Sequence, residues 1–134
     1  MNATQNFSTL ASVLIVEDEI YIIESLRFIL NQEGYDVFEV HDGNDAINLA
    51  REHQPDVIIL DLMLPNKNGF EILKEIKKDP GLCHIRVLML TAKGQQQDRT
   101  NADQLGVDAF ITKPFSNSEV LSCVRGLVTS KSKT

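Results

Sequence analysis

The sequence predicts an α/β fold: a doubly wound, five-stranded parallel sheet with about five helices on its two faces. Short apolar runs alternate along the chain with segments of helical periodicity. The runs at 13–16, 57–60 and 87–90 are continuously apolar, as in strands that are buried on both faces of a sheet. Two further runs, 35–40 and 107–112, mix polar with apolar residues, which indicates half-exposed strands at the sheet edges.

The strand order follows from this division into inner and edge strands. With the second and fifth strands at the edges and right-handed crossovers, the order is 2-1-3-4-5, one of the two common doubly wound arrangements. The connecting segments have helical signatures. Apolar side chains recur at helical spacing in the first and third of them, at Ile22, Leu26, Ile29, Phe70, Leu73 and Ile76. Asp42 with Asp45 is expected to cap the second helix, and Ser116 with Glu119 forms a capping box for the last one.

The fourth helical segment, 94–105, differs from the others because it offers only Ala102 and Leu105 to a core. Packing of an apolar face supplies most of the stability of a helix in a protein. This helix is therefore expected to be the least stable of the set, as an element that shifts during switching would need to be.

Length, charge and composition narrow the functional classes. The 134 residues fit one domain over 12–128, between a disordered N-terminal extension over 1–11 and a C-terminal tail over 129–134. A formal net charge of −6 disfavours direct binding to nucleic acid. No apolar run approaches the roughly 20 residues of a membrane-spanning helix. Cys83 and Cys123 lack metal-ligand spacing, so a cytoplasmic protein with reduced thiols is expected.

Acidic, hydroxyl and basic side chains follow the predicted strands at the points where those strands end. Glu17 and Asp18 come after the first strand, Asp61 after the third, Thr91 at the end of the fourth and Lys113 after the fifth. In a doubly wound sheet, ligands bind beyond the carboxyl ends of the strands where the strand order reverses, here between the first and third strands. These side chains are therefore expected to form one site.

The acidic members of this group predict a metal site. Clustered carboxylates repel one another unless a cation neutralises them, and Mg²⁺ prefers oxygen ligands. Glu17, Asp18 and Asp61 are the candidate ligands, and the backbone carbonyl of Met63 is a further one. The alternative is that acidic residues at strand ends only cap the following helices, a role that suits Glu19.

With a bound cation, Lys113 and Thr91 complete a site for phosphoryl transfer. Asp61 would attack phosphorus as a carboxylate nucleophile and form an acyl phosphate. Lys113 would neutralise charge on the equatorial oxygens, and Thr91 would donate a hydrogen bond to one of them.

Four motifs in this order, LIVEDE, LDLMLPNKNGFEIL, VLMLTA and DAFITKPF, resemble the receiver domain of bacterial two-component response regulators. The similarity covers roughly residues 12–128 and implies a flavodoxin-like fold. The roles that the resemblance implies are phosphoacceptor Asp61, acidic pair Glu17 and Asp18, hydroxyl switch Thr91, basic residue Lys113 and aromatic switch Phe110. It also implies a cis peptide between Lys113 and Pro114.

The resemblance further implies a signalling switch that catalyses only its own phosphorylation and dephosphorylation. The donor would be a phosphohistidine on a sensor histidine kinase or a histidine phosphotransfer protein. Phosphorylation would draw Thr91 toward the phosphoryl group, turn Phe110 inward and alter the face of the fourth helix, fifth strand and fifth helix. A downstream protein or effector domain would bind that face, and a homodimer on phosphorylation is a further expectation.

The sequence departs from the family pattern at few positions. The acidic pair is Glu-Asp where Asp-Asp is commoner, and Phe110 lacks the hydroxyl of the tyrosine often found there. Met63 and Lys93 occupy positions that, in this family, influence how long the phosphoryl group persists.

Two rival interpretations stay open at this point. One is a receiver-like interaction module that works without phosphorylation, against which the intact set of Asp18, Asp61, Thr91 and Lys113 argues. The other is an aspartate-nucleophile phosphatase, which usually carries a second carboxylate two residues after the nucleophile, where this chain has Met63. A nucleotide- or flavin-binding module is disfavoured because Glu-Asp-Glu follows the first strand and no G-x-G-x-x-G motif is present.

Overall fold

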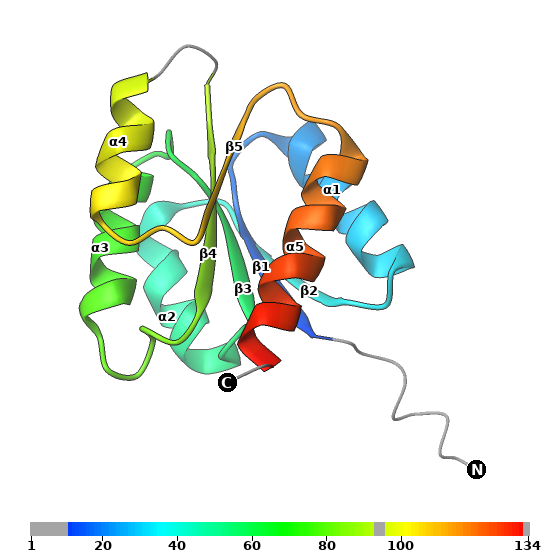
Figure 1. The fold of residues 1–134 in the computed structure, drawn as a ribbon, viewed down its shortest axis with the longest axis horizontal. Coiled ribbons are helices and arrows are strands. Elements are labelled where there is room, and N and C mark those ends of the chain that lie inside the picture. Colours follow the sequence, from blue (N-terminus) through cyan, green and yellow to red (C-terminus); the bar gives the residue numbers. More distant parts are fainter. Residues whose placement is uncertain (1–10, 93–95, 133–134) are drawn as a thin grey trace.

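A computed structural model describes residues 11–92 and 96–132 of the chain. The strands in this part are β1 (Ser12–Val16), β2 (Asp36–Val40), β3 (Val57–Asp61), β4 (Arg86–Thr91) and β5 (Ala109–Thr112). All of them pair in parallel in one sheet, with the order β2-β1-β3-β4-β5 (Figure 1). The predicted strand order and the predicted edge strands are confirmed.

The helices of the described residues are α1 (Ile20–Gln32), α2 (Gly43–His53), α3 (Gly69–Lys78), α4 (Gln96–Gln104) and α5 (Asn117–Ser132). α1 and α5 cover one face of the sheet, and α2, α3 and α4 cover the other (Figure 1). The predicted fold class is therefore confirmed. α5 continues to Ser132, into the segment 129–134 that was expected to be a tail, whereas residues 1–10 of the expected extension lie outside the described part.

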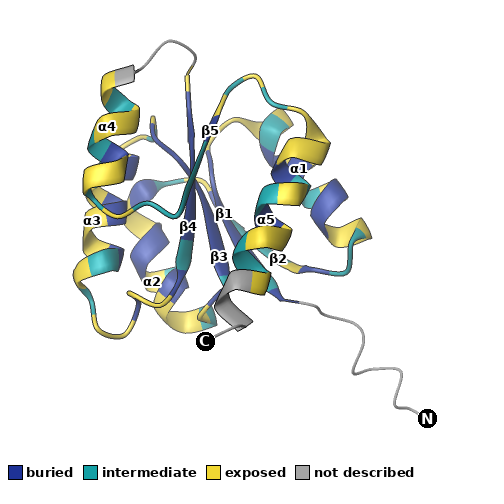
Figure 2. Ribbon diagram, viewed as in Figure 1, coloured by how far each residue is buried: buried dark blue, intermediate teal, exposed yellow. Residues whose placement is uncertain are grey.

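The sheet separates two apolar clusters. Side chains alternate along each strand, so that Leu14 and Ile58 face α2 and α3, whereas Ile15 and Ile59 face α1 and α5. The inner strands are almost completely buried, while β2 and β5 are half-buried (Figure 2). This is the difference that the continuous and mixed apolar runs predict.

α4 is the helix with the least contact to this core. Among the α4 residues whose burial is described, only Ala102 is buried, and most of the helix surface is exposed (Figure 2). Leu105, just beyond the helix, packs at the margin of the cluster. The guanidinium carbon of Arg99 lies 5.3 Å from the centroid of the Phe110 ring on β5, within the range of a cation–π contact. The expected shortage of core contacts in this segment is confirmed.

Side-chain caps define the starts of three helices. Asp42 accepts a hydrogen bond from a backbone N–H in the first turn of α2 at 2.8 Å. The hydroxyl of Ser116 accepts one from the N–H of Glu119 at 3.1 Å. Both caps were expected. Asn68 and Glu71 form a complete capping box at α3, which the sequence analysis did not identify.

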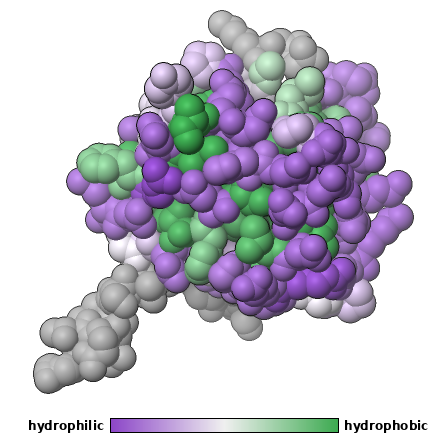
Figure 3. All heavy atoms as spheres, turned by 180° about the vertical axis from the view of Figure 1, so that it is seen from behind, coloured by the Kyte–Doolittle hydropathy of each residue, from purple (hydrophilic) through white to green (hydrophobic). Residues whose placement is uncertain are grey.

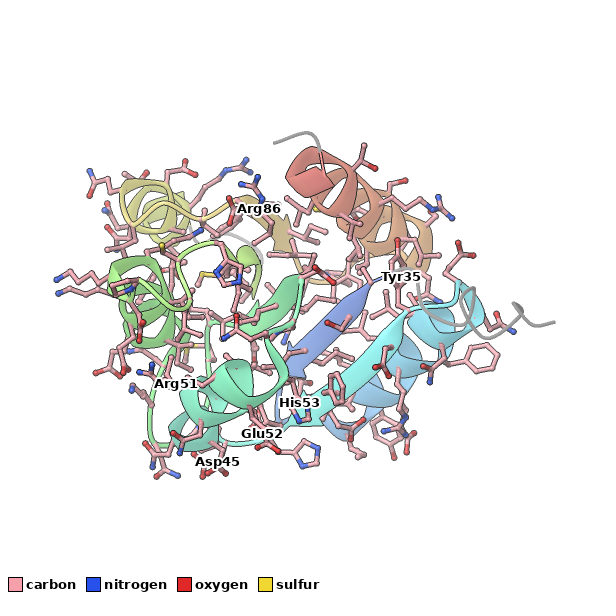
Figure 4. All side chains as sticks on the ribbon, turned by 90° about the horizontal axis from the view of Figure 1, so that it is seen from below. Tyr35, Asp45, Arg51, Glu52, His53 and Arg86 are labelled. Atoms are coloured by element: carbon pink, nitrogen blue, oxygen red, sulfur yellow. The ribbon has the colours of Figure 1, made fainter. Side chains whose placement is uncertain are left out.

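Asp108 links three elements at the end of the sheet where the strands begin. It accepts hydrogen bonds from the N–H of Val87 and from Nζ of Lys77, both at 2.8 Å, and lies 3.4 Å from the guanidinium of Arg86. Figure 4 shows this end of the molecule, with Arg86 labelled. These contacts join α3, β4 and the loop before β5.

Few large apolar side chains are exposed in the described part of the chain. They are Ile20, Tyr21 and Phe28 on α1, and Met63 after β3. The face of the molecule in Figure 3 is mostly hydrophilic, with hydrophobic side chains in separate patches. Among the described helices, none has the length and apolar character that a bilayer crossing requires.

Candidate functional site

The predicted site residues lie together at the carboxyl ends of four strands. Asp61 is the last residue of β3, and Thr91 is the last residue of β4. Glu17 follows β1 directly, and Lys113 follows β5. The reversal of strand order lies between β1 and β3, where doubly wound sheets bind their ligands.

Three carboxylates converge at this reversal. One carboxylate oxygen from each of Glu17, Asp18 and Asp61 lies within 4.8 Å of the other two. Glu17 is fully buried and Asp61 is only 3% exposed, whereas Asp18 is exposed. Oε2 of Glu17 accepts hydrogen bonds from the backbone N–H groups of Asp18 and Glu19, both at 3.1 Å. These two bonds fix the orientation of the Glu17 carboxylate.

Lys113 supplies positive charge to this acidic group. Its Nζ lies 3.0 Å from Oε1 of Glu19, 3.2 Å from Oε1 of Glu17 and 3.3 Å from Oδ1 of Asp61. The peptide bond between Lys113 and Pro114 is cis, as the family pattern implied. One ammonium group is therefore shared among three carboxylates.

Burial and charge shift the protonation equilibria of this group. Burial, together with the neighbouring Asp61 carboxylate, raises the pKa of Glu17 from its ordinary value of 4.5 to about 7. Burial alone would lower the pKa of Lys113. The hydrogen bond to Glu19 and the charges of Asp61 and Glu17 outweigh burial, so the pKa of Lys113 is raised. Because one lysine faces three carboxylates, the site carries an excess of negative charge.

The donor set of the acidic cluster fits Mg²⁺. Oε1 of Glu17 is buried and accepts no well-aligned hydrogen bond from the described residues, although Nζ of Lys113 lies 3.2 Å away. This oxygen can therefore still accept a ligand. The other candidate oxygens also come from carboxylates, and the exposed Asp18 leaves one side of the cluster open to solvent. Mg²⁺ prefers oxygen ligands and retains several of its waters. Glu17, Asp18 and Asp61 are therefore suitable ligands.

The structure adds no support for the roles that the sequence predicted for Met63 and Lys93. The side chain of Met63 is 71% exposed, which agrees with a role through the backbone alone, and its carbonyl as a metal ligand stays a prediction. Lys93 lies outside the described residues.

The hydroxyl of Thr91 is buried, and its Oγ1 has no hydrogen-bond partner among the described residues. Buried hydroxyls are normally paired, so this one is suited to bind a ligand oxygen. Met89 and Phe110 are paired across β4 and β5, and both belong to the cluster beneath α2, α3 and α4. Strand alternation places Thr91 on that same sheet face. The two predicted switch residues therefore share one face.

Contacts around the loop between β3 and α3 were not predicted from the sequence. The side-chain amide of Asn66, in the loop between β3 and α3, donates a hydrogen bond to Oδ2 of Asp42 at 2.6 Å. A Cβ atom on Gly43 would collide with a backbone carbonyl of that loop, and one on Gly69 would lie 2.7 Å from the carbonyl oxygen of Asp61. The two glycines are the sequence signals that would have indicated these close approaches.

The contacts of Glu19 also differ from the role that the sequence suggested for it. It occupies the N-cap position of α1, but its side chain makes no capping hydrogen bond. The carboxylate instead accepts a hydrogen bond from Lys113. The capping role that the alternative interpretation gave to Glu19 is therefore wrong, and its carboxylate contacts Lys113 instead.

The fold and these side chains define a class of small doubly wound domains with an acidic cluster, a buried hydroxyl and a lysine where the strand order reverses. The chain belongs to the response regulator receiver domain family, whose model matches residues 13–125. Members of this family typically act as phosphorylation-based switches and generally not as enzymes on separate substrates. Membership implies interaction with a histidine kinase and with downstream effectors.

Solved structures agree with this assignment. The signal receiver domain of a signal transduction histidine kinase from Syntrophus aciditrophicus is 32% identical, with a TM-score of 0.86 and coverage of 92% of this chain and 94% of that chain. The chemotaxis response regulator CheY4 of Vibrio cholerae is 29% identical, with a TM-score of 0.82 and coverage of 89% and 99%.

A third similar structure bears on the metal site. The receiver domain of a sensor histidine kinase from Pseudomonas aeruginosa PAO1 is 28% identical to this chain, with a TM-score of 0.81 and coverage of 89% and 98%. That structure is described with a magnesium ion coordinated in its active site cleft.

Proposed function

We propose that this domain is a Mg²⁺-dependent phosphorylation switch in which Asp61 accepts a phosphoryl group from a phosphohistidine. The observation that carries the proposal is the convergence of the buried Asp61 carboxylate with an acidic pair and Lys113 at the reversal of strand order. Each group has a chemical role in transfer to a carboxylate.

In the transfer step, a carboxylate oxygen of Asp61 forms a bond to phosphorus while the bond between phosphorus and the donor imidazole nitrogen breaks. The imidazole nitrogen keeps the electron pair, and the product is an aspartyl phosphate. Lys113 neutralises negative charge on the phosphoryl oxygens, and Thr91 donates its hydroxyl hydrogen to one of them. Mg²⁺, held by carboxylates of the acidic cluster and the carbonyl of Met63, would supply further charge neutralisation when bound.

A groove of about 550 Å³ next to Lys113 supports docking of a protein donor. Its lining includes Tyr21 from α1 and both Pro114 and Phe115 from the loop before α5. Tyr21 is 82% exposed, as a contact residue for a partner would be. A sensor histidine kinase or a histidine phosphotransfer protein would place its imidazole beside Asp61 from this side. The expected location of this domain is the cytoplasm.

The output would be a change in the face formed by α4, β5 and α5. Thr91 and Phe110 share one sheet face, and Phe110 contacts α4 through Arg99. A phosphoryl group that attracts the Thr91 hydroxyl would change the packing on this shared face, and Phe110 would pass the change to Arg99 on α4. Phosphorylation biases existing conformations by its differential interaction with them. A downstream protein, an effector domain or a second copy would then bind the altered face.

The test is intact-protein mass spectrometry after incubation with acetyl phosphate and Mg²⁺. We expect one phosphoryl adduct on the wild type and on Asp36→Asn, a control at the exposed start of β2. We expect no adduct on Asp61→Asn or in the presence of a chelator. Modification that persists in Asp61→Asn would refute the assigned phosphoacceptor. Absence of any adduct, also with phosphohistidine donors, would favour an interaction module that works without phosphorylation.

A further inference from the structure

Glu19 has an unusual position for a residue at the start of a helix. It is the N-cap of α1, yet its carboxylate does not bond the free N–H groups of the first turn, although capping is the common use of an acidic side chain there. Its contact with Lys113, at 3.0 Å, is the shortest of the three carboxylate contacts that the ammonium makes. The side chain is 61% exposed, so burial does not force it into this position.

The contact places Glu19 in competition with the phosphoacceptor. Lys113 lies 3.3 Å from Asp61, and it is the charge that transfer chemistry requires next to the phosphoryl oxygens. Its ammonium has three hydrogens to donate, and one of them is engaged by Glu19. Glu19 is not a member of the cluster that fits a metal ion, so its negative charge is not directly neutralised by that ion.

We propose that Glu19 is a positioning residue that competes with Asp61 for the Lys113 ammonium and thereby slows phosphorylation by small anionic donors. The inference rests on the proposed function. A small donor such as acetyl phosphate carries negative charge and meets the Glu19 carboxylate at the exposed side of the site. It also has to draw the Lys113 ammonium from Glu19 before its oxygens are fully neutralised.

The expected effect is moderate because Glu19 is exposed. Exposed ion pairs are worth about 0.2 to 1 kcal/mol, and 1.4 kcal/mol corresponds to a factor of ten in rate. Removal of the Glu19 charge is therefore expected to raise the phosphorylation rate by about 1.4- to fivefold. In the reaction, an Asp61 oxygen binds phosphorus while the bond between phosphorus and the acetyl oxygen breaks, and acetate leaves with the electron pair.

The first measurement compares initial rates of phosphorylation by acetyl phosphate and Mg²⁺ for three proteins. They are the wild type, Glu19→Gln and the matched control Glu24→Gln, which removes one exposed carboxylate from the same helix. We expect an increase of about 1.4- to fivefold for Glu19→Gln alone, and a smaller increase at high salt because screening weakens exposed charges. An unchanged or reduced rate, or an equal increase in Glu24→Gln, would overturn the proposal.

The second measurement needs neither metal nor phosphorylation. The ¹⁵N and ¹H chemical shifts of the Lys113 ammonium group are recorded in the metal-free protein for the same three proteins. Glu19→Gln should shift the Lys113 signal and speed its hydrogen exchange with water, whereas Glu24→Gln should leave both unchanged. An unperturbed Lys113 signal in Glu19→Gln would show that the two side chains do not interact in solution, which contradicts the inference.

The two measurements also separate the inference from the function on which it depends. If the wild type is phosphorylated on Asp61 and Glu19→Gln reacts at the same rate, the role of Glu19 is refuted and the proposed function stands. A wild type that is never phosphorylated overturns both.

Discussion

Substitution of Glu17 by glutamine is expected to stabilise the metal-free protein at pH 8 and to change its stability little at pH 5. Burial and the Asp61 carboxylate raise the pKa of Glu17 from 4.5 to about 7. Between these values the folded protein retains a proton that the unfolded chain has released. The free energy of unfolding of the wild type therefore falls as the pH rises from about 4.5 to about 7. Glutamine resembles the protonated carboxyl group and does not titrate.

The magnitude follows from the size of the shift. One pKa unit corresponds to about 1.4 kcal/mol, so the full shift at Glu17 corresponds to roughly 3 kcal/mol at pH 8. The substitution also removes the contact between Glu17 and Lys113, which offsets part of the gain. A stabilisation of about 1 to 3 kcal/mol at pH 8 is therefore expected, against less than about 0.5 kcal/mol at pH 5.

The assay is urea unfolding, followed by far-UV circular dichroism, of both proteins at pH 5 and pH 8 with a chelator present. Glu52→Gln, at an exposed position on α2 labelled in Figure 4, is the matched control. Mg²⁺ is expected to stabilise the wild type more than Glu17→Gln at pH 8. A difference between wild type and Glu17→Gln that is independent of pH, or larger at pH 5, would refute the reasoning about burial and charge.

Three further predictions, made on four substitutions, test other parts of the structure. Because the Thr91 hydroxyl has no partner among the described residues, Thr91→Val should change stability by less than about 1 kcal/mol and slow phosphorylation of Asp61 at least about tenfold. A stability loss above about 2 kcal/mol would show that the hydroxyl is already bonded. Gly69→Ala places a Cβ 2.7 Å from a backbone carbonyl oxygen and should cost about 1 to 3 kcal/mol in urea unfolding. Gly126→Ala, with nothing within 4 Å of its Cβ, should be neutral or stabilising by up to about 1 kcal/mol, and equal effects of the two would contradict this account. Asp108→Ala removes the acceptor of two hydrogen bonds at 2.8 Å. It should lower the free energy of unfolding, measured by thermal unfolding, by about 1 to 3 kcal/mol, and an unchanged stability would contradict this.

The sheet could be predicted from the sequence because the burial of each strand determines which of its positions are apolar. The run VIIL at 57–60 is apolar at every position, and β3 is buried at every position. The mixed composition of 35–40 reports the half-burial of β2 in the same way. Strand order then follows from which strands are inner, together with the handedness of the crossovers. The convergence of Asp61, Thr91 and Lys113 follows from that order, because parallel strands end at one edge.

Other parts of the site depend on side-chain direction and on contacts distant in sequence. Glu17 and Asp18 are adjacent, yet one is buried and the other exposed. The contact between Glu19 and Lys113 joins residues 94 positions apart, and the capping preference of an acidic residue at a helix start favoured a different role. The hydrogen bond between Asn66 and Asp42 likewise depends on how two loops pack, which no local pattern records.

The sparse anchoring of α4 has a thermodynamic consequence. The heat-capacity change of a conformational transition and the denaturant dependence of its free energy both scale with the surface that the transition exposes. Since Ala102 is the only buried side chain among the described α4 residues, displacement of this helix would expose little apolar surface. Its movement would therefore be almost invisible to calorimetry and to urea titration, and probes of local order along the helix would be needed to observe it.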